Sequence, residues 1–268
     1  MAAGLFGSLD YFARAAAIPA IAHWASWSLA APEIQPLGVG INLLPHAMRE
    51  LSELGLQQKL AERCIETREL AFYSRHGQFI YKEPRGRFAG YDWPQLSIHR
   101  GDLHQVLIDA VRTRLGHDSI LLDKRCEGVD QDNQGVTARF ADGSTARGSV
   151  AIACDGIHSA VRKQLYPDEG GVAYQGINMW RGVTRMKPYL SGASMVMAGW
   201  LEVGKLVVYP IRNDIDGQGM QLVNWVAELQ SPTHALQDWI RSSCFWVPSQ
   251  KYAESRLIIG RIMRRLWG

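Results

Sequence analysis

This sequence of 268 residues has no two cysteines at the close spacing of a metal or redox motif. It contains four cysteines, Cys64, Cys126, Cys154 and Cys244. They form no C-x-x-C pair, and no histidine pair at ligand spacing lies beside them. This pattern argues against a zinc site and against a disulfide framework. We therefore predict no metal site and a reducing compartment, the cytoplasm.

The chain also lacks long apolar runs and a strong charge of one sign. No uninterrupted run reaches the ~18 residues of a membrane-spanning helix. The net charge is +3, from 29 Lys and Arg against 26 Asp and Glu, which forms no basic stripe and argues against a nucleic-acid partner. With 47% hydrophobic residues and charges of both signs, the composition is typical of a globular chain with a sizeable core.

The two ends differ from the middle. Before residue 30 the only formal charges are Asp10 and Arg14, so the basic start of a signal peptide is missing, and Pro19 interrupts the apolar stretch. At residues 251–268 five cations stand against one carboxylate. That basic tail could lie on an anionic membrane or dock on its own protein, and we expect the second, without membrane contact.

Hydrophobic periodicity between these ends predicts an α/β fold. Helices are expected from Pro45, ended by Gly55, and over residues 101–115. A hairpin is expected at about residues 70–82, and short strands at 120–122, 127–131, 136–140 and 144–148. Alternating strands from about 176 to 228 predict a second, mostly antiparallel sheet.

Residues 150–153, the apolar run VAIA, predict a buried strand in the middle of a parallel sheet. Asp155 and Gly156 follow it, and Ser159 is a candidate N-cap for a helix over residues 160–165. Beyond a strand end, a carboxylate can accept hydrogen bonds from a sugar, and a glycine lets the backbone approach a phosphate. Asp-Gly is also a common tight turn, which is the more frequent interpretation of these two residues alone.

Four segments are more specific in combination: PLGVGINLLPHAMRELSELGL, SIHRGDLHQVLIDAV, VAIACDGIHSAVRKQL and GINMWRGVT. In their order and separations, over about residues 30–230, the chain resembles the FAD-dependent aromatic hydroxylases of the salicylate hydroxylase type, the class A flavin monooxygenases. The resemblance implies an FAD-binding Rossmann-like domain, incomplete here, and a mostly antiparallel β-sheet substrate domain. Its domains would be a divergent segment (1–30), a partial FAD-binding domain (31–170), the substrate-domain sheet (171–235) and a divergent basic tail (236–268).

The resemblance also implies a reaction and a cofactor site. Family members use NAD(P)H and O₂ to hydroxylate a small aromatic substrate on FAD. Gly38 and Gly40 fall on the turn beside the isoalloxazine ring, and Arg100 on the flavin-contacting arginine, although it could be only a surface charge at a helix start. Cys126 falls on the family position whose backbone contacts the adenine of FAD. Asp155-Gly156 falls on the D-G motif near the flavin and the path of the nicotinamide donor; the sequence identifies no catalytic residue.

The chain departs from this family at both ends. No G-x-G-x-x-G occurs in residues 1–30, Leu29 stands where the family has a ribose-binding Glu, and Ala153 stands for a glycine before the D-G motif. The later G-D-A-A-H word does not follow residues 222–229. Our hypothesis is a change of reading frame near Leu29 and after about Trp239, or a truncated gene copy. The chain as it stands is then expected to bind FAD poorly, and the alternative function is a non-catalytic remnant.

Overall fold

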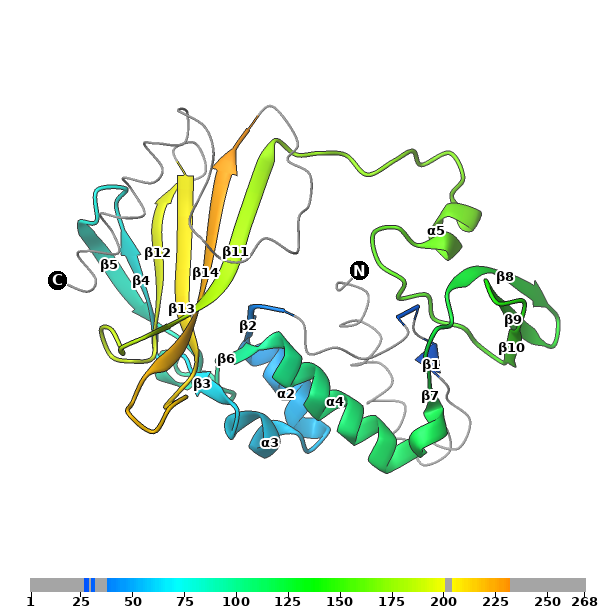
Figure 1. The fold of residues 1–268 in the computed structure, drawn as a ribbon, viewed down its shortest axis with the longest axis horizontal. Coiled ribbons are helices and arrows are strands. Elements are labelled where there is room, and N and C mark those ends of the chain that lie inside the picture. Colours follow the sequence, from blue (N-terminus) through cyan, green and yellow to red (C-terminus); the bar gives the residue numbers. More distant parts are fainter. Residues whose placement is uncertain (1–26, 29, 32–37, 201–203, 232–268) are drawn as a thin grey trace. The chain divides into compact units, whose positions relative to one another are not determined.

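The structure is a computed structural model that describes residues 27–28, 30–31, 38–200 and 204–231 (Figure 1). The predicted N-terminal segment before residue 27, the ribose position Leu29 and the basic tail lie outside these residues. The chain divides into two compact units. Of the described residues, the first unit joins 27–28 and 30–31 to 104–173, and the second joins 38–103 to 174–200 and 204–231. The domain bounds inferred from the resemblance remain a proposal.

The second unit contains a six-stranded sheet in the order β11-β14-β13-β12-β4-β5 (Figure 1). Every neighbouring pair is antiparallel except β12 with β4, which is parallel. This confirms the predicted antiparallel sheet and the hairpin, and it shows that the hairpin belongs to the same sheet. The strands are β4 (Glu69–Tyr73), β5 (Phe79–Pro84), β11 (Ile177–Met186), β12 (Ser194–Trp200), β13 (Gly204–Arg212) and β14 (Gln221–Gln230).

Strand β13 is buried on both faces, which explains its continuous apolar run. Leu206 and Val208 join one hydrophobic cluster, together with Val196, Ala198, Val223 and Ala227. The alternate residues Val207, Tyr209 and Ile211 form a second cluster, with Met195, Met197 and Val226 packed against it. The sheet therefore buries apolar side chains on two faces.

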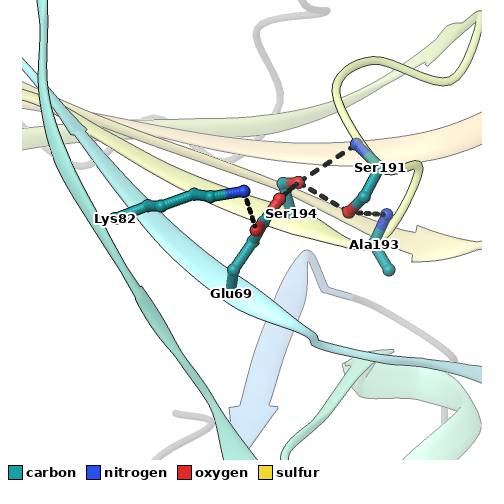
Figure 2. Close-up of polar contacts among 5 residues, drawn as sticks. All are labelled: Glu69, Lys82, Ser191, Ala193 and Ser194. Carbon is teal, nitrogen blue, oxygen red and sulfur yellow. Dashed lines mark hydrogen bonds and ion pairs between the residues drawn. The ribbon is translucent and has the colours of Figure 1, made fainter. Parts of the chain in front are cut away.

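A polar network fixes the parallel pair β4 and β12 (Figure 2). Ser194 Oγ donates to Glu69 Oε1 at 2.7 Å, and Lys82 Nζ donates to Glu69 Oε2 at 2.9 Å. Ser191 Oγ lies 2.8 Å from Ser194 Oγ. These bonds lower the pKa of Glu69 below its ordinary value, with the bond from Lys82 as the largest cause. The carboxylate thus connects strands β4, β5 and β12.

The second unit also holds a three-stranded sheet in the order β2-β6-β3. It is formed by β2 (Gly40–Leu43), β6 (Leu96–His99) and β3 (Cys64–Glu66), with helices α2 (Pro45–Glu53), α3 (Gln57–Ala61) and η1 (Gly86–Ala89). Pro45 opens α2, and Gly55 follows its end with φ +69°, so the predicted helix and its glycine are confirmed.

The first unit contains α4, a small parallel pair and a three-stranded sheet. Helix α4 (Arg100–Leu115) starts in the second unit and continues in the first. The parallel pair is β1 (Trp27–Ser28) with β7 (Ile120–Leu121), after η2 (His117–Ser119). The sheet has the order β10-β9-β8, and α5 follows: β8 (Cys126–Asp132), β9 (Gly135–Phe140), β10 (Thr145–Gly148) and α5 (Ala160–Leu165). The predicted helices and short strands are confirmed.

The buried strand predicted at residues 150–153 is wrong. These residues form no strand, and the side chains of Val150 and Ile152 are 76% and 40% exposed. An apolar run becomes a buried parallel strand only when neighbouring strands supply its hydrogen bonds. Among the described residues of the first unit, the parallel pairing is confined to the two residues each of β1 and β7.

Candidate functional site: a glycine segment held between two sheets

Residues 38–40, which we name the glycine segment, are fixed by three hydrogen bonds at three successive residues. The carbonyl of Gly38 accepts from His99 Nε2 at 3.0 Å, and the carbonyl of Val39 accepts from the N–H of Arg100, also at 3.0 Å. The N–H of Gly40 donates to Asn224 Oδ1 at 2.7 Å. The segment is therefore held from β6, from the start of α4 and from β14.

The ring of His99 has a defined tautomer. The N–H of Gly101 donates to His99 Nδ1 at 3.1 Å, so Nδ1 is an acceptor. The neutral ring then carries its proton on Nε2, the nitrogen that faces the Gly38 carbonyl. His99 thus connects the glycine segment to the first turn of α4.

Gly38 is required by its conformation and by its neighbour. Its φ of +144° lies in a region that residues other than glycine rarely adopt. A Cβ added there would lie 2.7 Å from Arg100 Nε. The Arg100 side chain therefore lies against Gly38. Burial lowers the pKa of Arg100, and the positive charge of Arg181 lowers it further, so two cationic side chains lie near this part of the site.

Gly40 is required by close packing. A Cβ there would lie 2.7 Å from Asn224 Cβ and 2.8 Å from both Ile211 Cγ2 and Tyr209 Cε2. Tyr209 on β13 and Asn224 on β14 are paired residues of neighbouring strands. Gly40 therefore packs directly against this pair on the six-stranded sheet. Burial raises the pKa of Tyr209 to about 12, and its hydroxyl is protonated at neutral pH.

In the first unit, Asp155 caps a helix. Its Oδ1 accepts from Ser159 Oγ at 2.5 Å and its Oδ2 accepts from the N–H of Ala160 at 2.8 Å. Ser159 Oγ accepts in turn from the N–H of Arg162 at 2.9 Å, which confirms Ser159 as the N-cap. Gly156 has φ +83°, and its carbonyl accepts from the N–H of Ser159 at 3.1 Å, so Asp155-Gly156 opens a tight turn. Each carboxylate oxygen retains a second lone pair for another donor.

Cys126 starts β8, and its thiol contacts its own strand. Sγ lies 3.5 Å from the Gly128 carbonyl, to which it donates. Burial raises the pKa of this thiol, and the charge of nearby Asp155 adds to the increase. Two bonds between the Gln164 side chain and the backbone of Val129, at 2.9 and 2.6 Å, hold α5 on β8. Because the turn leads into α5 and Cys126 lies on β8, these bonds hold the turn and Cys126 in one part of the first unit.

The structure places the six predicted site residues in two groups. Gly38, Gly40 and Arg100 meet in the second unit, and Cys126 shares the first unit with Asp155-Gly156. Their roles toward FAD remain predictions. Asn224, His99 and Tyr209 were not predicted as site residues from the sequence. A signal for Asn224 was present, because it is a polar residue at a buried position of the strand MQLVNWVAEL.

Over the ranges that the structure describes, no helix is long and apolar enough to cross a membrane. The same ranges hold no group of three or more His, Cys, Asp or Glu side chains arranged to bind a metal ion.

Curated relatives resemble this chain over two thirds of its length or more. The chain is 39% identical over 202 residues to phenazine 1,6-dicarboxylic acid hydroxylase of Lysobacter antibioticus, which covers 73% of this chain and 50% of the relative. It is 33% identical over 188 residues to 3-amino-4-hydroxybenzoate 2-monooxygenase of Streptomyces cremeus, covering 67% and 45%. The chain thus spans about half the length of the curated relatives it matches.

Solved structures share the fold. A variant of HpxO from Klebsiella pneumoniae, complexed with FAD, superposes with a TM-score of 0.69 at 22% identity, covering 86% of this chain and 57% of that one. The 2,6-dihydroxypyridine-3-hydroxylase of Arthrobacter nicotinovorans gives 0.60 at 23% identity, covering 85% and 54%. At these identities the likeness concerns the fold alone.

The family is shown by a match to residues 32–231, which include both groups of predicted site residues. This chain belongs to the FAD binding domain family, as its resemblance to the FAD-dependent aromatic hydroxylases implied.

Proposed function

We propose that this chain belongs to an FAD-dependent monooxygenase that hydroxylates a small aromatic substrate with NAD(P)H and O₂. The observation that carries the proposal is the glycine segment, held by three hydrogen bonds beside Arg100 in a chain of the FAD binding domain family. The names of the relatives support the substrate class, because they act on ring compounds such as a phenazine dicarboxylic acid and an aminohydroxybenzoate.

The residues of the second unit fit a flavin. Added β-carbons at Gly38 and Gly40 would meet protein side chains at 2.7–2.8 Å, so both glycines are needed to pack residues 38–40 where they lie. Packed in this way, the segment would offer a fixed stretch of backbone to a planar ring. The guanidinium of Arg100 is suited to oxygen acceptors on the cofactor because its planar fork donates two parallel hydrogen bonds.

Bound FAD would supply the redox chemistry that delivers one oxygen atom from O₂ to the substrate. The part of this chain is to bind and to orient. The glycine segment would set the distance of the ring from the six-stranded sheet, and Arg100 would donate hydrogen bonds to the cofactor. Tyr209, whose raised pKa keeps its hydroxyl protonated, would offer a neutral donor on that sheet. Asp155 would act by position, because hydrogen bonds from Ser159 and Ala160 already fix its carboxylate.

A second candidate is a chain that holds FAD weakly and turns over little substrate. It is favoured by the exposed residues 150–153, since they lead into the D-G motif without the strand that normally carries it. If two or three hydrogen bonds from the D-G segment to charged groups of the cofactor are then not made, at ~1.5–3 kcal/mol each, the FAD dissociation constant would move toward the millimolar range.

One assay separates the two candidates. The purified chain is incubated with FAD, NAD(P)H, ¹⁸O₂ and a panel of aromatic carboxylic acids, and the products are analysed by mass spectrometry. Hydroxylated product that carries ¹⁸O, with NAD(P)H oxidation stimulated by the acid, supports the monooxygenase. A protein that is colourless as purified, and that gives no labelled product even when millimolar FAD is added, supports the second candidate.

A further inference from the structure

We propose that Asn224 is a positioning residue, which holds the glycine segment on the six-stranded sheet and thereby fixes the backbone surface that would face the flavin. The bond that carries this inference joins two residues 184 positions apart in the sequence, Asn224 Oδ1 and the N–H of Gly40. The consequence for FAD rests on the proposed function, whereas the fixing of the segment does not.

Packing alone does not explain why an asparagine occupies position 224. Its side chain is fully buried, and its Nδ2 has no hydrogen-bond partner among the described residues. A buried amide donor without a partner destabilises the fold, a cost that an apolar side chain would avoid. What the asparagine provides, and what such a side chain would lack, is the acceptor for Gly40.

The neighbours of Asn224 make this bond a positional constraint. Gly40 packs so closely on Asn224, Tyr209 and Ile211 that no β-carbon fits between them. Steric contact therefore prevents β2 from coming closer to β14, and the hydrogen bond prevents the two strands from moving apart. His99 at the end of β6 and Arg100 at the start of α4 bond the carbonyls of Gly38 and Val39. Neither residue belongs to the six-stranded sheet, so the Asn224 bond is the one of the three that joins the segment to that sheet.

Whether Asn224 holds the glycine segment is tested by measuring hydrogen exchange of the Gly40 amide in the ¹⁵N-labelled full chain. Asn224→Leu keeps the number and branching of the side-chain heavy atoms and removes the acceptor, and Asn224→Asp keeps an oxygen at the same place. The matched control is Asn178→Leu, which changes another buried asparagine of the same sheet, one that pairs with Leu229. If Asn224→Leu does not fold, Asn224→Ser replaces it, because its shorter side chain also withdraws the acceptor.

We expect Asn224→Leu to speed exchange at Gly40 by ~2- to 12-fold, as the loss of one net hydrogen bond implies. Asn224→Asp should restore most of the protection, and Asn178→Leu should leave it unchanged. Equal exchange rates at Gly40 in wild type and Asn224→Leu would overturn the proposal. Equal acceleration in Asn178→Leu would also overturn it, because the effect would then be general loosening of the sheet.

The consequence for the cofactor is measured by titrating FAD against the same labelled proteins and following the glycine amide shifts. The proposal expects the FAD dissociation constant to rise at least threefold in Asn224→Leu and to recover in Asn224→Asp. If exchange at Gly40 accelerates while FAD affinity is unchanged, Asn224 does not position the flavin surface. If the wild type binds no FAD, the proposed function fails, and the exchange rates still decide whether Asn224 holds the segment.

Discussion

The glycine segment of the second unit and residues 150–156 of the first unit both match family motifs, yet they differ in what supports them. Residues 38–40 are held at each position by a hydrogen bond, and Gly40 is enclosed by Asn224, Tyr209 and Ile211. Residues 150–153 form no strand, and Val150 is 76% exposed. A motif in the sequence therefore does not by itself show that the surrounding structure positions it.

The difference has a physical origin in where each segment finds its partners. The glycine segment obtains its bonds from His99, which ends the paired strand β6, from Arg100, which follows it, and from Asn224 in the six-stranded sheet. The D-G motif obtains its bonds locally, within five residues along the chain, from Ser159 and Ala160. Local caps fix a turn, but they do not fix the strand before it.

The largest expected effect is that of a methyl group at Gly40. Gly40→Ala should lower the free energy of unfolding of the second unit by ~1–3 kcal/mol, because the added carbon meets three packed groups within 2.8 Å. Gly156→Ala should cost ~1–2 kcal/mol, from the left-handed backbone alone. Urea unfolding of both variants measures the contrast. A smaller loss for Gly40→Ala than for Gly156→Ala would show that the glycine segment is not the more tightly packed of the two.

A smaller effect is expected for the cap of α5. Ser159→Ala removes the acceptor for the N–H of Arg162 and the donor to Asp155, and should cost ~1 kcal/mol. Exchange of the α5 amides should accelerate, while that of Gly40 should not change. Transmission of the Ser159→Ala effect to the Gly40 amide would break the comparison, since it would mean that the two segments depend on each other.

The smallest effect concerns Glu69 and depends on pH (Figure 2). Its pKa in the folded protein is lowered from 4.5, first by the bond from Lys82 and then by that from Ser194. A lowered pKa means that the stabilisation is complete above pH 4.5 and is lost as the pH falls through the folded value. Glu69→Gln should therefore destabilise by less than ~1 kcal/mol at pH 7, after allowance for solvent screening, and by less at pH 3.5.

The control for Glu69 is Asp130→Asn, which alters the exposed pair of Asp130 with Arg139 and should leave stability unchanged. Thermal or urea unfolding at the two pH values gives the result. A Glu69→Gln effect that grows on acidification has the wrong sign for this account.

Much of the fold could be predicted from the sequence because its signals are local. Pro45 with Gly55, the two halves of the hairpin, and Ser159 before α5 each mark an element by residues a few positions apart. Residues 150–153 were mispredicted for the opposite reason. Whether an apolar run becomes a buried strand depends on partners elsewhere in the chain, which periodicity does not report.

The candidate site was predicted only in part. The glycines and Arg100 could be named because they lie in recognisable motifs, and the structure brings them together. Asn224 could not be assigned to Gly40, since a contact across 184 residues follows from how the two sheets pack. The polar residue in a buried register was visible in the sequence, but its partner was not.

The glycine segment with Arg100 is proposed to form a flavin-binding surface. The most direct measurement is a titration of FAD, up to millimolar concentrations, against ¹⁵N-labelled wild type and Arg100→Ala, followed at the amides of Gly38 and Gly40. We expect saturable shifts at both glycines and a dissociation constant roughly tenfold higher for Arg100→Ala, since one hydrogen bond from a charged donor contributes ~1.5–3 kcal/mol. Equal dissociation constants, or an absence of shifts at the two glycines, would contradict the account.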